Sequence, residues 1–227
     1  MRARSPKGRG KYARLGLSTK APLDPTTHAM LLRQLYLALF EERRFERAQE
    51  VALQAVELGI LSDVIHQDVA RAALALGEIE VGLSHLRLAA RQGPASRRAF
   101  HWWTLGSTLF LAQRYDEASA ALLRASRWGT RDKPLYRAHL ALIQIARGER
   151  LRDITDIVSN LANAPCGQGY GRFVLGHLAY AGGSWKEARK YLEVFVKRIE
   201  AARPSISIAL TGEVDMAKAT LIKMAAN

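Results

Sequence analysis

Residues 102–125 read WWTLGSTLFLAQRYDEASAALLRA, and this stretch decides the fold. Apolar side chains recur at helical spacing on both sides of the polar turn AQRYDE. Large residues such as Trp102 and Leu122 alternate with small ones, Gly106 and Ala118, which let two antiparallel helices approach closely. The stretch therefore predicts a helix–turn–helix pair with a tightly packed seam.

The same pattern recurs along the chain. A short motif at the start of each second helix repeats at positions 48, 82, 118, 153 and 188, which are 34, 36, 35 and 35 residues apart. The fifth copy is nearly as complete as the third, with Leu175 and Gly176 in its first helix and Trp185 and Ala188 in its second. One such pair cannot bury its apolar faces alone, so neighbouring pairs are expected to stack.

These motifs and their spacing resemble the tetratricopeptide (TPR) family, whose period is about 34 residues. The resemblance implies an all-α, right-handed α-solenoid of about five TPR-like helix pairs with a C-terminal capping helix. Asp24 and Pro25 are a good helix start, because Asp caps free amides and Pro fits the first turn. Within a repeat region of 24–203, the pairs are expected near 25–58, 62–92, 96–128, 132–163 and 167–202, followed by the capping helix at 204–227. Polar Asp153 and Asn160 depart from the pattern in the fourth pair.

In this family the first helix of each pair lines a concave groove, so the resemblance implies which side chains face a partner. They are mostly apolar or aromatic, which is typical of a contact surface rather than of a basic clamp for a chain terminus. We also weigh the alternative that they pack internally, are covered by the chain's own tail, or are buried in a homo-oligomer. The predicted groove residues are Met30, Arg33, Leu37, Phe40, Arg71, Phe100, Trp103, Ser107, Phe110, Leu142, Tyr170, Phe173, His177 and Tyr180.

The formal net charge is +13, and residues 1–23 contribute seven cations and no acid. Their glycines and proline predict a basic N-terminal arm that is disordered alone. Such an arm can bind a polyanion, fold back onto the acidic first pair around Glu41 and Glu46, or act as a transit peptide. The candidate polyanion-binding residues are Arg2, Arg4, Lys7, Arg9, Lys11 and Arg14 in the arm, and Arg87, Arg91, Arg124 and Arg127 in a basic strip on second helices.

Other function classes find little support in the sequence. Cys166 is the single cysteine, no face gathers several histidines, and the glycines at 167–171 lack the Gly-Lys-Ser/Thr of a phosphate loop. We therefore expect no catalytic residue, metal or cofactor, no transmembrane segment, and a cytoplasmic location. The preferred function is a protein-binding adaptor, scaffold or chaperone that holds an apolar segment of a partner. The alternatives are a protein that binds nucleic acid or another polyanion, and a permanent structural subunit of a larger complex.

Overall fold

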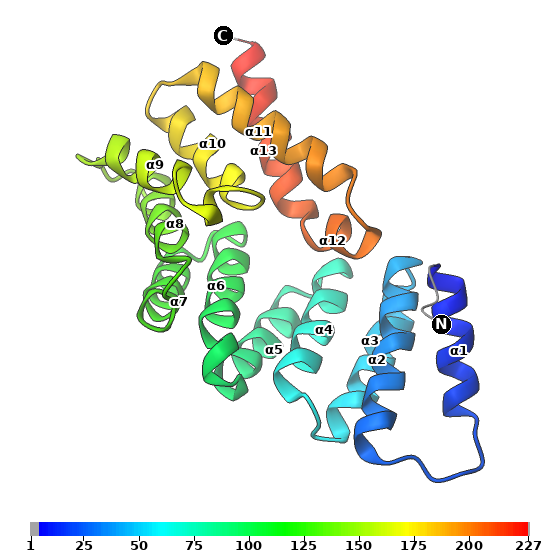
Figure 1. The fold of residues 1–227 in the computed structure, drawn as a ribbon. Helices are drawn as coiled ribbons and strands as arrows, with labels where there is room; N and C mark the ends of the chain where they lie inside the picture. Colours follow the sequence, from blue (N-terminus) through cyan, green and yellow to red (C-terminus); the bar gives the residue numbers. More distant parts are fainter. Residues whose placement is uncertain (1–4, 227) are drawn as a thin grey trace. The chain divides into compact units, whose positions relative to one another are not determined.

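A computed structural model describes residues 5–226 of the chain, and in that range every regular element is helical (Figure 1). The elements are thirteen α-helices and one 3₁₀ turn. The all-α prediction is therefore confirmed. Helices contact mainly their neighbours in chain order, and the chain divides into two compact units, Met1–Ser96 and Arg97–Asn227. They are called unit 1 and unit 2 below.

Unit 1 is a row of antiparallel helices. In chain order they are α1 (Pro6–Leu17), α2 (Pro25–Glu41), α3 (Phe45–Glu57), α4 (Ser62–Ala75) and α5 (Ile79–Gln92). Each helix packs against the next, and α2 also touches α4, so α2 and α4 share one face. The carboxylate of Asp24 accepts a hydrogen bond from the amide of Thr27, with Pro25 in the first turn, which confirms the predicted start of α2.

Unit 2 contains the remaining helices. They are α6 (Ala95–Leu111), α7 (Tyr115–Trp128), α8 (Lys133–Ala146), α9 (Ile154–Ala162), α10 (Gly171–Ala181), α11 (Trp185–Glu200), α12 (Pro204–Ala209) and α13 (Thr211–Ala225). A 3₁₀ turn at Pro165–Gly167 joins α9 to α10. Helix α8 packs against α7 and α10, and α13 packs against α10 and α11.

The first helix of every pair ends in the same turn. The second residue after the end of each of these helices adopts a positive φ. The amide of the next residue then donates to the carbonyl five residues earlier, as from Arg44 to Leu39 at 2.9 Å. Glycine takes this left-handed conformation without strain, whereas other residues adopt it at a cost. The left-handed turn residues are Arg43, Gly77, Gln113, Gly148 and Gly183, with φ of 60°, 80°, 59°, 82° and 78°. They provide a common reference point for comparing the pairs.

Small residues form the seam between paired helices, as the third and fifth copies predicted. A Cβ added to Gly106 would lie 2.8 Å from Cγ of Leu122, and one added to Gly176 would collide with Leu192. The matching alanines of the second helices, Ala48, Ala118 and Ala188, are fully buried. In unit 1 a Cβ added to Gly82 would lie 2.7 Å from Cγ of Leu74, so the predicted close approach is present in both units.

The fourth pair departs from the predicted register. Three residues separate the two helices in the other pairs, but seven, 147–153, separate α8 from α9. Asp153 lies exposed before α9, and half-buried Ile157 takes the fourth position of that helix, where Ala48 and Ala118 stand in theirs. The assignment of Asp153 to the seam was wrong, because four extra residues in the turn shift the helix without disturbing the average spacing.

The prediction of a disordered N-terminal arm is also wrong over residues 6–17. They form α1, whose first turn is capped by Ser5 and begins with Pro6. The glycines that argued against a helix serve its contact with α2: Gly10 faces Ala38 and Gly16 faces Leu31. A Cβ added to Gly16 would lie 2.9 Å from a Leu31 methyl group, so the glycine leaves room for this close approach. Arg2 and Arg4 lie outside the described residues.

The C-terminal segment, predicted as a capping helix at 204–227, is divided between α12 and α13. Its buried residues Glu213, Val214, Ala217, Thr220 and Met224 recur at helical spacing and face the rest of unit 2. Helix α13 covers the side of α11, reaches α10, and at Gly212 approaches Leu111 of α6. This helix therefore lies against first helices as well as beside the last pair.

Candidate functional site

The first-helix face of unit 2 encloses a buried polar cluster beneath α13. The hydroxyl of Tyr170 donates a hydrogen bond to a carboxylate oxygen of Glu213 at 3.2 Å, and Ser107 Oγ donates to the same oxygen at 3.3 Å. The two hydroxyls also lie 2.5 Å apart. Burial raises the pKa of Glu213 to about 7, and the hydrogen bonds from Tyr170 and Ser107 only partly oppose this shift. Helix α13 is thus attached to α6 and to the N-terminal end of α10 through a buried carboxyl group whose pKa is raised.

Two histidines lie in the same interior. His139 of α8 is fully buried between the rings of Phe110 and Tyr170, and neither of its ring nitrogens has a hydrogen-bond partner among residues 5–226. Nδ1 of His177 lies 3.5 Å from the hydroxyl of Thr220. Burial lowers the pKa of His139 to about 3 and that of His177 to about 4. Both rings are therefore neutral at pH 7.

Most of the predicted groove residues of unit 2 are inside this interior. Ser107, Phe110, Leu142, Phe173 and His177 are buried. Trp103, Tyr170 and Tyr180 are partly buried, and Phe100 is 43% exposed. Their arrangement matches the alternative in which the chain's own tail covers them, because α13 supplies Glu213 and Thr220 to three of these residues. As α13 lies here, the buried members are not available to a partner.

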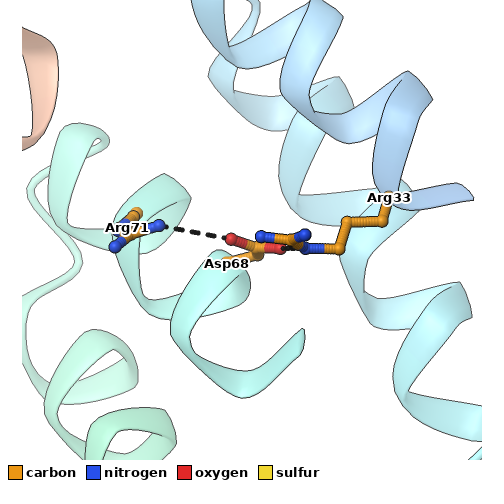
Figure 2. A network of polar contacts seen from close by, with 3 residues as sticks. All are labelled: Arg33, Asp68 and Arg71. Carbon is orange, nitrogen blue, oxygen red and sulfur yellow. Dashed lines mark hydrogen bonds and ion pairs between the residues drawn. The ribbon is translucent and has the colours of Figure 1, made fainter. Parts of the chain in front are cut away.

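The first-helix face of unit 1 has different chemistry at the corresponding positions. Arg33 Nε of α2 donates to Asp68 of α4 at 2.7 Å, and Arg71 reaches the other carboxylate oxygen of Asp68 at 3.4 Å (Figure 2). The Asp68 side chain is 1% exposed, whereas those of Arg33 and Arg71 are 26% and 36% exposed. Burial raises the pKa of Asp68, and the two guanidinium groups oppose that shift.

Apolar side chains flank these arginines. Met30 is 40% exposed and Leu37 is half-buried, whereas Phe40 is fully buried against Tyr36 and Phe45. Of the five groove residues predicted in unit 1, four therefore keep exposed surface. They combine two positively charged groups with apolar area.

The basic residues predicted as polyanion ligands are found in three settings. Arg9 of α1 is paired with Glu41 at 2.9 Å, so the arm does fold back onto the acidic first pair at this point. Lys7, Lys11 and Arg14 are exposed along one side of α1. Arg87 is half-buried, Arg91 is exposed, and Arg124 and Arg127 lie exposed on α7 of unit 2.

Sequence reasoning missed three residues that organise these faces: Asp68, His139 and Glu213. Asp68 and His139 occupy groove positions, nine residues before the left-handed turns at Gly77 and Gly148. Counting back from each turn would have found both. Glu213 offered a weaker signal, a lone acid on the apolar face of a terminal helix, and its partners lie 43 and 106 residues away.

Other kinds of site are not found in the described range. Among residues 5–226, no group of three or more His, Cys, Asp or Glu side chains is placed to hold a metal ion. No helix in the same range is both long and apolar enough to cross a membrane. Cys166 is half-buried, and burial raises the pKa of its thiol.

Comparisons with known proteins leave the family open. A scan of protein-family models found no match to this chain, and a search of curated proteins found no significantly similar sequence.

Proposed function

We propose that the chain is a non-enzymatic adaptor or chaperone that holds an amphipathic, acid-bearing helix of a partner protein against α2 and α4 of unit 1. In this proposal the helix pairs form one right-handed solenoid of the tetratricopeptide type, which works in a reducing compartment such as the cytoplasm. The observation that carries the proposal is the packing in unit 2, where α13 lies against first helices. The first-helix residues that contact α13 correspond in position to residues of α2 and α4 in unit 1.

The equivalence of the two faces follows from the shared turn. Leu37, Ser107 and His177 each stand six residues before a left-handed turn residue, and Met30, Phe100 and Tyr170 each stand thirteen before it. In unit 2, Ser107, Tyr170 and His177 contact α13. Their counterparts in unit 1, Leu37 and Met30, are half-buried and exposed, so they offer apolar surface at the positions that hold a helix in unit 2.

The charge of the partner follows from Arg33 and Arg71. Asp68 fixes the position of both guanidinium groups, which lowers the entropy cost of binding an anion. Each guanidinium has five N–H donors, more than the contacts with Asp68 use. Two cations share one acid, so this face favours a carboxylate on the bound helix.

A peptide-display selection on the immobilised full chain tests this proposal. We expect enriched peptides to combine an acidic residue with apolar residues three and four positions apart, the spacing of one helix face. Synthetic versions should bind at least tenfold more weakly to Met30→Glu and Arg71→Ala, since each loses a direct contact. Arg47→Ala is the matched control, because Arg47 is an exposed cation on α3.

Circular dichroism should show that all three variants keep the helical content of the wild-type chain. Peptides without the acidic–apolar pattern, or equal affinity for Met30→Glu and the wild type, would show that this face is not the binding site.

A further inference from the structure

A second surface lies on the outer side of α6 and α7 in unit 2, where positive and aromatic side chains alternate. The guanidinium carbon of Arg98 lies 4.4 Å from the ring centre of Trp128, and that of Arg124 lies 4.6 Å from the ring centre of Trp102. Each stack joins the first half of α6 to the second half of α7, so the two stacks are neighbours along the antiparallel pair. We define the basic-aromatic patch as Arg98, Trp102, Arg124, Arg127, Trp128 and Arg131.

The charge of this patch is unbalanced. Between Ala118 and Gly148 the only acidic residue is Asp132, and none occurs from residue 81 to residue 115. Arg124, Arg127 and Arg131 are exposed. The first turn of α8 continues the positive surface, because Tyr136 packs against Gly129 at the end of α7 and Lys133 and Arg137 are exposed beside it. Such an excess of cations attracts phosphate groups.

The indoles provide what a purely electrostatic surface lacks. Half of the surface of Trp128 is exposed although a guanidinium stacks on its ring. An exposed indole offers a π-face to an unpaired base, and stacking on such a ring stabilises binding of single strands whatever their sequence. In a duplex the bases are stacked on one another and cannot reach it. An acidic peptide would use the cations but leave the indoles without a function.

We propose that the basic-aromatic patch of α6 and α7 binds single-stranded nucleic acid, with Arg124, Arg127 and Arg131 contacting phosphates and Trp128 stacking on a base. This surface does not involve the α2–α4 face, so the proposal can be tested independently of the proposed adaptor function. The contact is sequence-tolerant, because phosphate contacts and stacking do not read base edges.

Fluorescence anisotropy with labelled twelve-nucleotide oligo-uridine and oligo-thymidine tests the proposal on the full chain. Arg124→Gln/Arg127→Gln should weaken binding at least tenfold and reduce the slope of log affinity against log salt by about 1.4, since two phosphate contacts with a single strand are lost. Trp128→Ala should weaken binding roughly fivefold or more with an unchanged slope, and Trp128→Phe should keep most of the affinity. The matched control is Lys197→Gln/Arg198→Gln, which removes the same charge from the exposed last turn of α11.

Two further probes separate other partners. A blunt duplex of matched length should bind more weakly than the single strand and should not respond to Trp128→Ala. Vesicles containing phosphatidylserine should not distinguish Arg124→Gln/Arg127→Gln from the control. The proposal is overturned if the control loses as much affinity as Arg124→Gln/Arg127→Gln, if single strand and duplex bind alike, or if the vesicles bind through the patch and the oligonucleotides do not. Thermal melting must show that each variant is folded at the assay temperature.

Discussion

Unit 1 and unit 2 place different chemistry on the same helical frame. Ten residues before the left-handed turn, α2 carries Arg33, whereas α6 and α10 carry Trp103 and Phe173. Nine residues before it, α4 carries Asp68 and α8 carries His139. The same positions therefore hold an ion-paired, partly exposed surface in unit 1 and a buried aromatic interior in unit 2.

This difference shows that two features are specified separately: the helical frame, meaning the left-handed turns and the seams, and the side chains on the first-helix face. The turn and the seam depend on backbone conformation and side-chain size, and both units meet those demands. The side chains on the first-helix face depend instead on whether another helix covers that face. In unit 2 the first-helix face packs against α13, whose buried side combines apolar residues with Glu213 and Thr220. The following experiments challenge this contrast, beginning with the largest expected effect.

Truncation of Phe173 should have a large effect on stability. The side chain is fully buried and contacts the rings of Tyr170, His177 and Phe195, so Phe173→Ala should lower the free energy of unfolding by about 4 kcal/mol. Urea unfolding followed by circular dichroism measures this loss. Phe100→Ala is the control, because Phe100 is 43% exposed on α6 and should cost much less. Similar losses in both variants would contradict the buried character of the unit 2 face.

Unit 1 should respond to charge rather than to aromatic volume. Arg33→Met/Arg71→Met leaves the buried carboxyl of Asp68 without a partner and should destabilise the chain by about 3 kcal/mol at pH 7. Adding Asp68→Asn should restore most of that stability, because the unpaired charge is then gone. Urea unfolding at pH 7 checks both steps. If the added substitution restores nothing, Asp68 is not the cause of the loss.

Part of this contrast could be predicted from the sequence. The spacing of small and large residues gave the helical class and the seams at Gly106 and Gly176, because these depend on size and local periodicity. Helix propensity does not predict α1, because glycine disfavours a helix, whereas in the structure Gly10 and Gly16 allow contact with Ala38 and Leu31. That contact joins residues more than a dozen positions apart, beyond the reach of local propensity.

The candidate site was less predictable than the frame. Groove positions could be assigned from the repeat, but the burial of Ser107 and His177 depends on α13, which lies outside the repeat and carries no motif. The four extra residues before α9 were hidden for a similar reason. Average spacing was preserved because the following connection to Ala188 is correspondingly shorter, so only the structure places Ile157 in the position expected for Asp153.

The pH dependence of unit 2 should reveal the buried polar cluster. The folded-state pKa of Glu213 is raised from 4.5 to about 7, so its contribution is fully present below pH 4.5 and is lost as the pH rises through 7. Glu213→Gln stays neutral and should be more stable than the wild type by about 3 kcal/mol at pH 8, with little difference at pH 4.5. Urea unfolding from pH 4 to 8 measures both curves.

The histidines act in the opposite direction. The pKa values of His139 and His177 are lowered from 6.5 to about 3 and about 4. The unfolded chain therefore takes up protons first as the pH falls below 6.5, and the folded state becomes less stable. Glu213→Gln should therefore keep the acid side of the profile and lose the decline above neutrality. A decline that persists in this variant would assign it to another group.

The smallest expected effect concerns what the two units share. Arg43 in unit 1 and Gln113 in unit 2 adopt φ of 60° and 59°. This conformation costs a non-glycine residue about 1 kcal/mol or more. Glycine avoids that strain, but part of the gain is offset because glycine loses more backbone entropy on folding. Arg43→Gly and Gln113→Gly should each raise stability by about 0.5 kcal/mol, and Gly77→Ala should lower it by about 1 kcal/mol. Thermal melting at pH 6.5 resolves these shifts. Equal gains at positions 43 and 113 are required if the frame is common to both units, whereas a gain in one unit alone would mean that the turn, like the face, is adapted to its surroundings.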